Sequence, residues 1–351
     1  MGAIALSPTN IVNNQLTYDK DNTYISLYKY EESPEIMIKE GDIIFVKTGS
    51  TVGKVAYVDK LICKTTLNPQ VVVLKDIQCN NYYLYAIMST HYFQNNIQKI
   101  TVGGAVPTLS QAAMSNIVIS LPFVKEQNKI AKFLSLLDER IATQNKIIDK
   151  LESLIKGISR KLLDEEEGHY VSLENILKER IEKTTINNQY EVLSSTVNGI
   201  FIQREYFSRE IASSNNVGYK VLRLNEIVLS PQNLWMGNIN YNKSFKIGIV
   251  SPSYKIFSIA DCYDKDFIAA LLKTNRALYN YALASEQGAS IVRRNLNIEA
   301  FKQIVFKLPS YKKQCQIGKT ISLLEKSLEN NMKLKNSYEL QKTYLLRQMF
   351  I

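Results

Sequence analysis

A repeated apolar spacing between Leu121 and Leu163 constrains the fold of this chain more than any other feature. Apolar side chains recur in alternating steps of four and three residues, which is typical of a helix packed along another in a left-handed coiled coil. The predicted seam comprises Ile130, Leu134, Leu137, Ile141, Gln144, Ile148, Leu151 and Ile155, of which only Gln144 is polar. About 40 helical residues would form a rod of roughly 60 Å, and such a rod needs a partner of similar length.

The partner helix is predicted in the same chain, because the segment 308–351 repeats the first one. Placing Leu308-Pro309 on Leu121-Pro122 also places Arg347 on Arg160, and no insertion is needed between them. An internal repeat of this kind indicates two similar halves, each a domain followed by a long helix. The second seam comprises Ile317, Ile321, Leu324, Leu328 and Asn331.

Gln144 and Asn331 are the polar residues of the two seams, and they occupy the same position in the repeat. If the helices pair antiparallel about a twofold axis, we expect these amides to meet near the middle. A buried amide without a partner costs about 1–3 kcal/mol, so a paired layer would fix the register of the helices. The alternative is that both side chains lie on the solvated flank.

The remaining sequence predicts an α+β fold with two similar mixed domains. The first domain spans 1–120, the first long helix 121–163, the second domain 164–307 and the second long helix 308–351. Each domain contains an apolar strand candidate followed by a polar loop. Those loops, 47–54 and 230–238, align with Gly53 on Gly237, yet their polar residues differ. Such a difference is expected of two recognition domains with two different targets.

The first half lacks a counterpart of residues Val171 to about Ser195. We therefore expect the first domain to be without the opening helix and strand of the second domain. The positions of the two repeats place the matching segment before Met1.

The net charge of +10 and the pI of about 9.1 favour a polyanionic partner. An AT-rich coding sequence would also enrich lysine, so charge alone does not decide this point.

The sequence has no apolar run long enough to span a membrane and no signal-peptide pattern. Its four cysteines are scattered and it has two histidines, so a zinc site is not expected. These features predict a reduced, cytoplasmic protein.

The chain resembles the specificity subunits of type I restriction–modification systems. The resemblance rests on the stretch GDIIFVKTGSTVGKV at 41–55, the segment LPFVKEQNKIAKFLSLLD at 121–138 and its second copy at 308–325. It implies two target recognition domains that each read one half of a split double-stranded DNA sequence, held apart by the antiparallel helices. It also implies two docked methyltransferase subunits and an endonuclease–translocase subunit that can join them.

The candidate DNA contacts lie in the two loops and near the end of the second domain. They are Lys47, Thr48, Ser50, Thr51, Lys54, Arg204, Gln232, Asn233, Trp235, Asn238, Arg293 and Arg294. Lysine, serine and threonine suit phosphate contacts, glutamine and asparagine suit adenine edges, and arginine suits phosphate or guanine. The alternatives are a solvated hairpin at 47–54, a core position for Trp235 and a plain surface pair for Arg293-Arg294.

The sequence argues against an enzyme. The segment 49–54 has too few residues between its glycines for a phosphate-binding loop, and Val55 follows Lys54. Ser251-Pro252-Ser253-Tyr254 resembles the aromatic-ended tetrapeptide of adenine methyltransferases, but no glycine-rich cofactor loop accompanies it. We expect no cofactor in this chain, with S-adenosylmethionine, Mg and ATP sites in partner subunits. A coiled-coil scaffold whose domains bind proteins is the other open interpretation.

Overall fold

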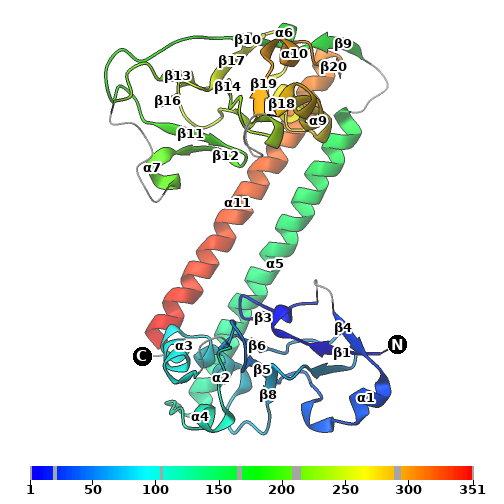
Figure 1. Cartoon of the computed structure of the whole chain (residues 1–351), viewed down its shortest axis with the longest axis vertical. Helices are drawn as coiled ribbons and strands as arrows, with labels where there is room; N and C mark the ends of the chain where they lie inside the picture. The colour runs from blue at the N-terminus through cyan, green and yellow to red at the C-terminus, as the bar shows by residue number, and fades with distance from the viewer. Residues whose placement is uncertain are drawn as a thin grey trace. The chain divides into compact units, whose positions relative to one another are not determined.

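The computed structural model describes residues 2–18, 22–102, 106–163, 168–207, 215–287 and 294–349 (Figure 1). The chain forms two compact units, Met1–Lys146 with Met332–Ile351 and Ile147–Asn331. Each long helix is therefore divided between the units. These helices are α5 (Val124–Leu163) and α11 (Tyr311–Met349), and they begin three residues after the predicted Leu-Pro starts.

The first unit is built on a five-stranded sheet in the order β2-β3-β6-β5-β8, beside a three-stranded sheet in the order β4-β1-β7. Its strands are β1 (Ala3–Leu6), β2 (Ile11–Val12), β3 (Gln15–Leu16), β4 (Thr23–Ile25), β5 (Ile43–Val46), β6 (Val55–Tyr57), β7 (Thr65–Leu67) and β8 (Val71–Leu74). Its short helices are α1 (Leu27–Glu31), α2 (Asn81–Met88), α3 (His91–Ile100) and α4 (Gln111–Ser115).

The central strand β5 of the first unit is buried on both faces. Ile43 and Phe45 pack into a cluster with α2, α3 and the start of α5. Ile44 and Val46 pack into a second cluster on the other face. Alternate residues of a strand point to opposite faces, so an unbroken apolar run marks a strand covered on both sides.

The second unit has a four-stranded sheet in the order β10-β17-β14-β15 and three two-stranded ribbons beside it, β11-β12, β13-β16 and β18-β19. Its strands are β9 (His169–Ser172), β10 (Leu177–Glu179), β11 (Leu193–Thr196), β12 (Gly199–Ile202), β13 (Lys220–Arg223), β14 (Glu226–Leu229), β15 (Ile239–Tyr241), β16 (Ile247–Val250), β17 (Lys255–Ile259), β18 (Ser285–Gln287), β19 (Arg294–Leu296) and β20 (Val305–Leu308). Its short helices are α6 (Leu173–Ile176), α7 (Gln203–Tyr206), α8 (Lys265–Leu271), α9 (Asn275–Leu283) and α10 (Ile298–Lys302).

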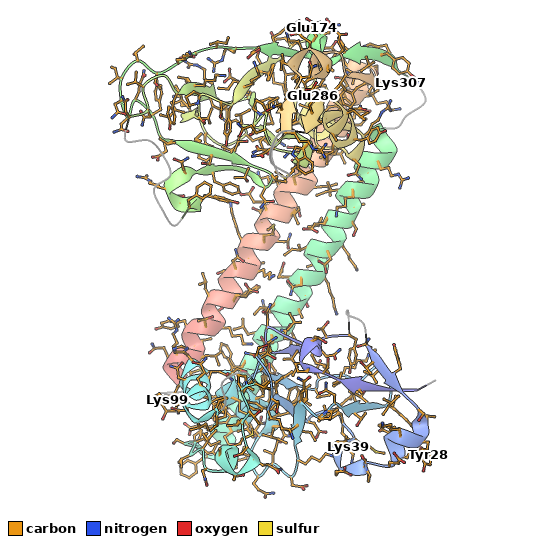
Figure 2. The ribbon with its side chains drawn as sticks, in the orientation of Figure 1. Tyr28, Lys39, Lys99, Glu174, Glu286 and Lys307 are labelled. Carbon is orange, nitrogen blue, oxygen red and sulfur yellow. The ribbon has the colours of Figure 1, made fainter. Side chains whose placement is uncertain are left out.

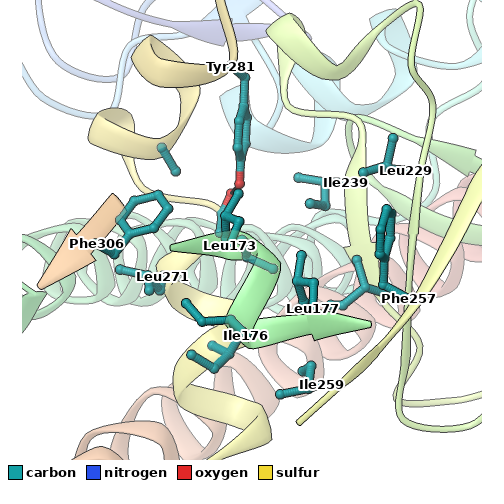
Figure 3. Close-up of a cluster of buried hydrophobic side chains, with 14 of the residues drawn as sticks. Leu173, Ile176, Leu177, Leu229, Ile239, Phe257, Ile259, Leu271, Tyr281 and Phe306 are labelled. Carbon is teal, nitrogen blue, oxygen red and sulfur yellow. Dashed lines mark hydrogen bonds between the residues drawn. The ribbon is translucent and has the colours of Figure 1, made fainter. Parts of the chain in front are cut away.

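The core of the second unit joins this sheet to its short helices and to the first turns of α11. Figure 3 shows Tyr281, Phe306 and Leu173 among the buried side chains. The Tyr281 hydroxyl is inside the core and donates to the Leu272 carbonyl at 3.1 Å. Ile317 and Ile321 of α11 belong to the same cluster, so the long helix is part of the unit's core.

The internal repeat is present in the strand registers as well as in the sequence. Ile43 pairs with Tyr57 between β5 and β6, and Ile227 pairs with Tyr241 between β14 and β15. The alignment that places Gly53 on Gly237 also places each residue of the first pair on its counterpart in the second. The two domains are therefore copies of one scaffold.

Gln127 and Gln314 occupy the same repeat position, and each fastens a long helix to a short helix of its own unit. Gln127 Oε1 accepts from Asn80 N at 3.0 Å, and Gln314 Oε1 accepts from Asp264 N at 3.2 Å. Each Nε2 donates at 2.9 Å to the carbonyl of the proline that precedes the helix. Asn80 and Asp264 are the N-caps of α2 and α8. The Leu-Pro-to-Gln spacing therefore corresponds to a hydrogen-bond pattern that the two halves share.

Gly318→Ala is expected to destabilise the second unit by about 1–3 kcal/mol, because the added methyl overpacks the contact between α11 and α8. A Cβ at Gly318 would lie 2.2 Å from Asp264 Oδ1 and 2.7 Å from Phe267 N. Ala131 holds this repeat position in the first unit and is 4% exposed there, so Ala131→Gly is the matched control. Urea unfolding measures both variants, and an unchanged midpoint for Gly318→Ala would contradict the close packing.

Within the first unit, α5 and α11 contact each other and run antiparallel, as predicted. Lys342 Nζ donates to both carboxylate oxygens of Asp138, at 2.6 and 2.8 Å. Further along α5, Arg140 Nη1 donates at 3.4 Å to the hydroxyl of Tyr338, which precedes Lys342 on α11. In the second unit, Ile158 of α5 packs against the cluster that contains Ile321 of α11.

The predicted seam side chains are buried or half-buried. Those buried are Leu134, Leu137, Ile141, Ile317 and Ile321. Those half-buried are Ile130, Gln144, Ile148, Leu151, Ile155, Leu324, Leu328 and Asn331. The seam is therefore most deeply buried near the start of each helix, where the helix also packs on its own domain.

The predicted pairing of Gln144 in the first unit with Asn331 in the second stays a prediction. Asn331 Nδ2 donates to the Ser327 carbonyl of its own helix at 2.7 Å. Gln144 Oε1 is buried and has no hydrogen-bond partner among the described residues. Asp138 contacts Lys342, and Arg140 contacts Tyr338. If this antiparallel spacing continues along α5, Gln144 lies opposite Lys335 within the first unit.

The second unit begins with a segment that has no equivalent among the described residues of the first. β9 pairs antiparallel with β20, the strand that leads into α11. At the same repeat position in the first unit, residues 118–121 form no strand, and the Val118 side chain is 87% exposed. The lack of an opening helix and strand in the first domain stays a prediction.

Candidate nucleic-acid interface

The first candidate loop, residues 47–54, is a compact turn between β5 and β6. Gly49 and Gly53 have φ values of 104° and 98°, a conformation that favours glycine. Val52 N donates to Gly49 O, and Gly53 N donates to Val46 O. Because these amides are bonded within the turn, the loop does not offer the row of free N–H groups of a phosphate-binding loop.

The last segment of the first domain lies against this turn. Thr48 forms a β-bridge with Thr108, and Leu109 N donates to Lys47 O at 2.8 Å. Ser50 is exposed, while Lys47, Thr48 and Thr51 are half-buried. The Lys47 side chain has no hydrogen bond or ion pair with the part of the chain that the structure describes. The structure thus gathers four candidate residues in one turn beside the 106–109 segment.

The second candidate loop spans residues 230–238. It contains a single turn of 3₁₀ helix, η3 (Leu234–Met236), where the first loop has its glycine turn. Leu234 is fully buried in the core and anchors the loop. Gly237 ends the turn with a φ of 94°, at the repeat position of Gly53. Gln232 is exposed, and Asn233 and Trp235 are half-buried. Anchoring by Leu234 leaves the polar side chains of the loop at or near the surface.

Arg294 joins this loop from a distant part of the sequence. Its guanidinium carbon lies over the Trp235 ring, 4.4 Å from the ring centroid. Its backbone N donates to Gln232 O at 3.2 Å. Its Nε is buried and has no hydrogen-bond partner among the residues described. The structure therefore brings three predicted contact residues together, and Trp235 is a half-buried platform for an arginine rather than a core residue.

Lys54 and Asn238 occupy one repeat position, and both side chains bond to their own unit. Lys54 Nζ donates to Ile11 O at 3.2 Å, and Asn238 Nδ2 donates to Ser195 O at 2.9 Å. Ile11 and Ser195 are separated by the same 184 residues as Lys54 and Asn238. Asn238 is only 4% exposed, and its Oδ1 accepts from Ser195 Oγ at 2.8 Å. The prediction of Asn238 as a DNA contact is wrong, because both ends of its amide are bonded in the interior. The Lys54 ammonium likewise donates to a backbone carbonyl of its own domain, that of Ile11.

Asn238→Leu is expected to reduce the unfolding free energy of the second unit by about 1–3 kcal/mol, because the two interior hydrogen bonds between Asn238 and Ser195 are lost. The DNA sequence preference of the chain should stay the same. Gln232→Leu is the matched control in the same loop, and it should leave stability unchanged while altering the preference. Thermal unfolding and competition binding measure the two effects. A stable Asn238→Leu variant with an altered preference would restore Asn238 as a contact.

The remaining predicted arginines fall outside this cluster. Arg204 lies on α7 and forms an ion pair with Glu191 at 3.2 Å, with both side chains exposed. An exposed pair of this kind contributes little to stability, so the guanidinium stays accessible to solvent and ligand. Arg293 lies outside the described residues.

Lys273 supports the second loop and is not among the residues predicted from the sequence. It lies between α8 and α9, and its Nζ donates to Gly237 O at 2.9 Å and to Val197 O at 3.4 Å. Desolvation of the ammonium group lowers the pKa of Lys273 to about 8, with the Glu325 carboxylate opposing the shift. A lone lysine between two helices gives no sequence signal for this role.

The described residues contain neither a metal-binding cluster nor a membrane-spanning helix. No three His, Cys, Asp or Glu side chains lie close enough together to hold a metal ion in this part of the chain. No helix among these residues combines the length and the apolar character needed to cross a membrane.

Residues 6–153 match the family described as type I restriction modification DNA specificity domain. The match covers the first domain and most of α5. The match includes two of the three stretches on which the resemblance rests, 41–55 and 121–138.

Two curated proteins of Methanocaldococcus jannaschii are similar to parts of the chain. The type I restriction enzyme MjaVIII specificity subunit is 33% identical over 130 residues, which are 36% of this chain and 29% of that protein. The putative type I restriction enzyme MjaX specificity subunit is 30% identical over 145 residues, 40% of this chain and 34% of that protein. These matches therefore span about a third of each relative.

The whole chain has the fold of a solved specificity subunit. The S subunit of a type I restriction–modification system from M. genitalium superposes with a TM-score of 0.64 at 16% identity, covering 100% of this chain and 92% of that one. At this identity the likeness shows the fold, which is the predicted pair of similar α/β domains with two long helices.

Proposed function

We propose that the chain is the DNA-recognition subunit of a type I restriction–modification complex and that each unit reads one half of a bipartite duplex target. The observation that carries this proposal is the repeat itself. One scaffold holds a loop at the same position in both units, with Thr48, Ser50 and Thr51 in one and Gln232, Asn233 and Trp235 in the other. A shared scaffold with different surface side chains suits two readers of two different sequences.

The chemistry of these residues supports a duplex as the ligand. Glutamine and asparagine pair bidentately with adenine edges, and arginine pairs with guanine or phosphate. The net charge of +10 favours a polyanion. The chain then supplies specificity without catalysis and acts in the cytoplasm, where the host DNA is.

Partner subunits supply the chemistry in this proposal. Two methyltransferase subunits dock on the chain, one for each copy of the repeat, and an endonuclease–translocase subunit joins them. S-adenosylmethionine, Mg and ATP bind in those subunits rather than in this chain.

Duplex binding as a function of salt concentration tests the proposal. Each phosphate contact contributes about one unit to the slope of log affinity against log salt. We expect a steep salt dependence and a preference for one duplex sequence in the presence of the methyltransferase subunits. Weak binding without sequence preference, together with retention of protein partners, would favour the scaffold interpretation instead.

A further inference from the structure

Each unit contains a groove between the turn that joins two short helices and the end of a long helix. The first groove has a volume of about 870 Å³ and lies between Ser89–Tyr92 and the last turns of α11. The second groove has a volume of about 880 Å³ and lies between Lys273–Arg276 and the last turns of α5. Each groove is contained within its own unit.

The two grooves are built from equivalent residues. Thr90 and Thr274, which cap α3 and α9, line them and are equivalent in the alignment of the two domains. Arg347 and Arg160 line them and are equivalent in the alignment of the two long helices. The walls also share equivalent helix positions, with Lys342 and Thr343 in the first groove and Ile155 and Lys156 in the second. A cavity repeated from matching positions of two diverged domains indicates one kind of occupant that binds twice.

The lining favours a protein segment over DNA. Asp138 and Glu325, which are equivalent, place a carboxylate in each groove. Ile141 and Leu346 line the first groove, and Ile155 and Ile321 line the second. Apolar walls gain from burial against other apolar groups. A volume of this size holds a few side chains of a partner.

The arginines define the charge of that partner. Arg160 and Arg347 are exposed and form no ion pair with the described residues. The groove carboxylates, by contrast, are already paired, Asp138 with Lys342 at 2.6 Å and Glu325 with Lys243 at 2.8 Å. In the second groove Lys307, labelled in Figure 2, adds a further cation. The charge that repeats in both grooves without an ion pair to a described residue is therefore that of Arg160 and Arg347.

We propose that each groove binds the same segment of a methyltransferase subunit, a segment that combines apolar side chains with a carboxylate directed at Arg160 or Arg347. This inference rests on the proposed function, because it takes the methyltransferase subunit as the partner. It assigns the two copies to two equivalent sites, one on each unit, and it explains why the groove residues repeat while the loop residues differ.

Charge reversal at the arginines tests the inference with the full chain and the purified methyltransferase subunit of the same system. Native mass spectrometry counts bound methyltransferase subunits for Arg160→Glu, Arg347→Glu and the double variant. We expect each single variant to lose one subunit and the double variant to lose both, with at least a tenfold weaker affinity at each altered site. Lys146→Glu and Lys333→Glu are the controls, since these exposed residues also share a repeat position and line neither groove.

The other outcomes are also decisive. A double variant that still binds two methyltransferase subunits overturns the inference and leaves the proposed function standing. A double variant that assembles fully but loses duplex affinity makes the grooves DNA contacts and overturns the inference as well. If the unaltered chain binds neither the methyltransferase subunit nor DNA, the proposed function fails and the inference fails with it.

Discussion

Replacing Arg294 with alanine is expected to relax one base-pair position in one half of the DNA target and to weaken binding of the cognate duplex by about 1–3 kcal/mol. The guanidinium lies over Trp235 at 4.4 Å with its Nε buried, so the direction of the group is restricted. No described residue bonds its terminal nitrogens, which can pair with the O6 and N7 atoms of a guanine. Restricted orientation lowers the entropy cost of such a pair.

The same experiment separates base reading from phosphate binding. If Arg294 contacts a guanine, Arg294→Ala relaxes one position of the motif and leaves the other half intact. A variant that weakens all duplexes equally and lowers the salt slope by about one would show a phosphate contact instead. Arg223→Ala is the control, because Arg223 is an exposed arginine of the same unit with an ion pair to Glu182 and is not a candidate contact. Trp235→Ala should mimic Arg294→Ala, because the platform is lost.

Gln314→Ala is expected to reduce the unfolding free energy of the second unit by about 2–4 kcal/mol, because a buried amide and its hydrogen bonds are removed together. The Gln314 side chain is 1% exposed, and its loss leaves Asp264 N and the Pro309 carbonyl without their partner. The cavity left by the truncated side chain adds to the cost. Because Asp264 caps α8, hydrogen exchange should speed up in Lys265–Leu271.

Gln127→Ala is the matched variant in the first unit, where it should act on α2 instead of α8. Hydrogen exchange by mass spectrometry follows both helices in one experiment. Equal protection of α8 in Gln314→Ala and in the unaltered chain would show that the buried amide does not hold the helix to the domain.

The sequence is sufficient to predict the repeat because the two copies align without an insertion, and the physical constraints on the repeat are local. Gly53 and Gly237 align in sequence and both adopt left-handed φ values. The Leu-Pro-to-Gln spacing aligns and yields the same buried amide bonds in both units. Features of this kind depend on a few residues close together in the chain, so their pattern is visible before the structure.

The site can be predicted only in part, because it depends on contacts between distant segments. The pairing of Arg294 with Trp235 and the bonds of Lys273 to two carbonyls join such segments. Asparagine suits adenine, yet the Asn238 side chain points inward to Ser195. Residue type indicates what a side chain can bind, whereas its direction depends on the packing around it.

Methylome sequencing of a host that carries this chain with its methyltransferase subunit tests the central claim most directly. We predict one methylated motif made of two specific halves separated by a fixed spacer. Changing Gln232 and Asn233 should alter one half, and changing Thr48 and Thr51 should alter the other. A motif without two separate halves, or a change in either loop that alters both halves together, would contradict the assignment of one half-site to each unit.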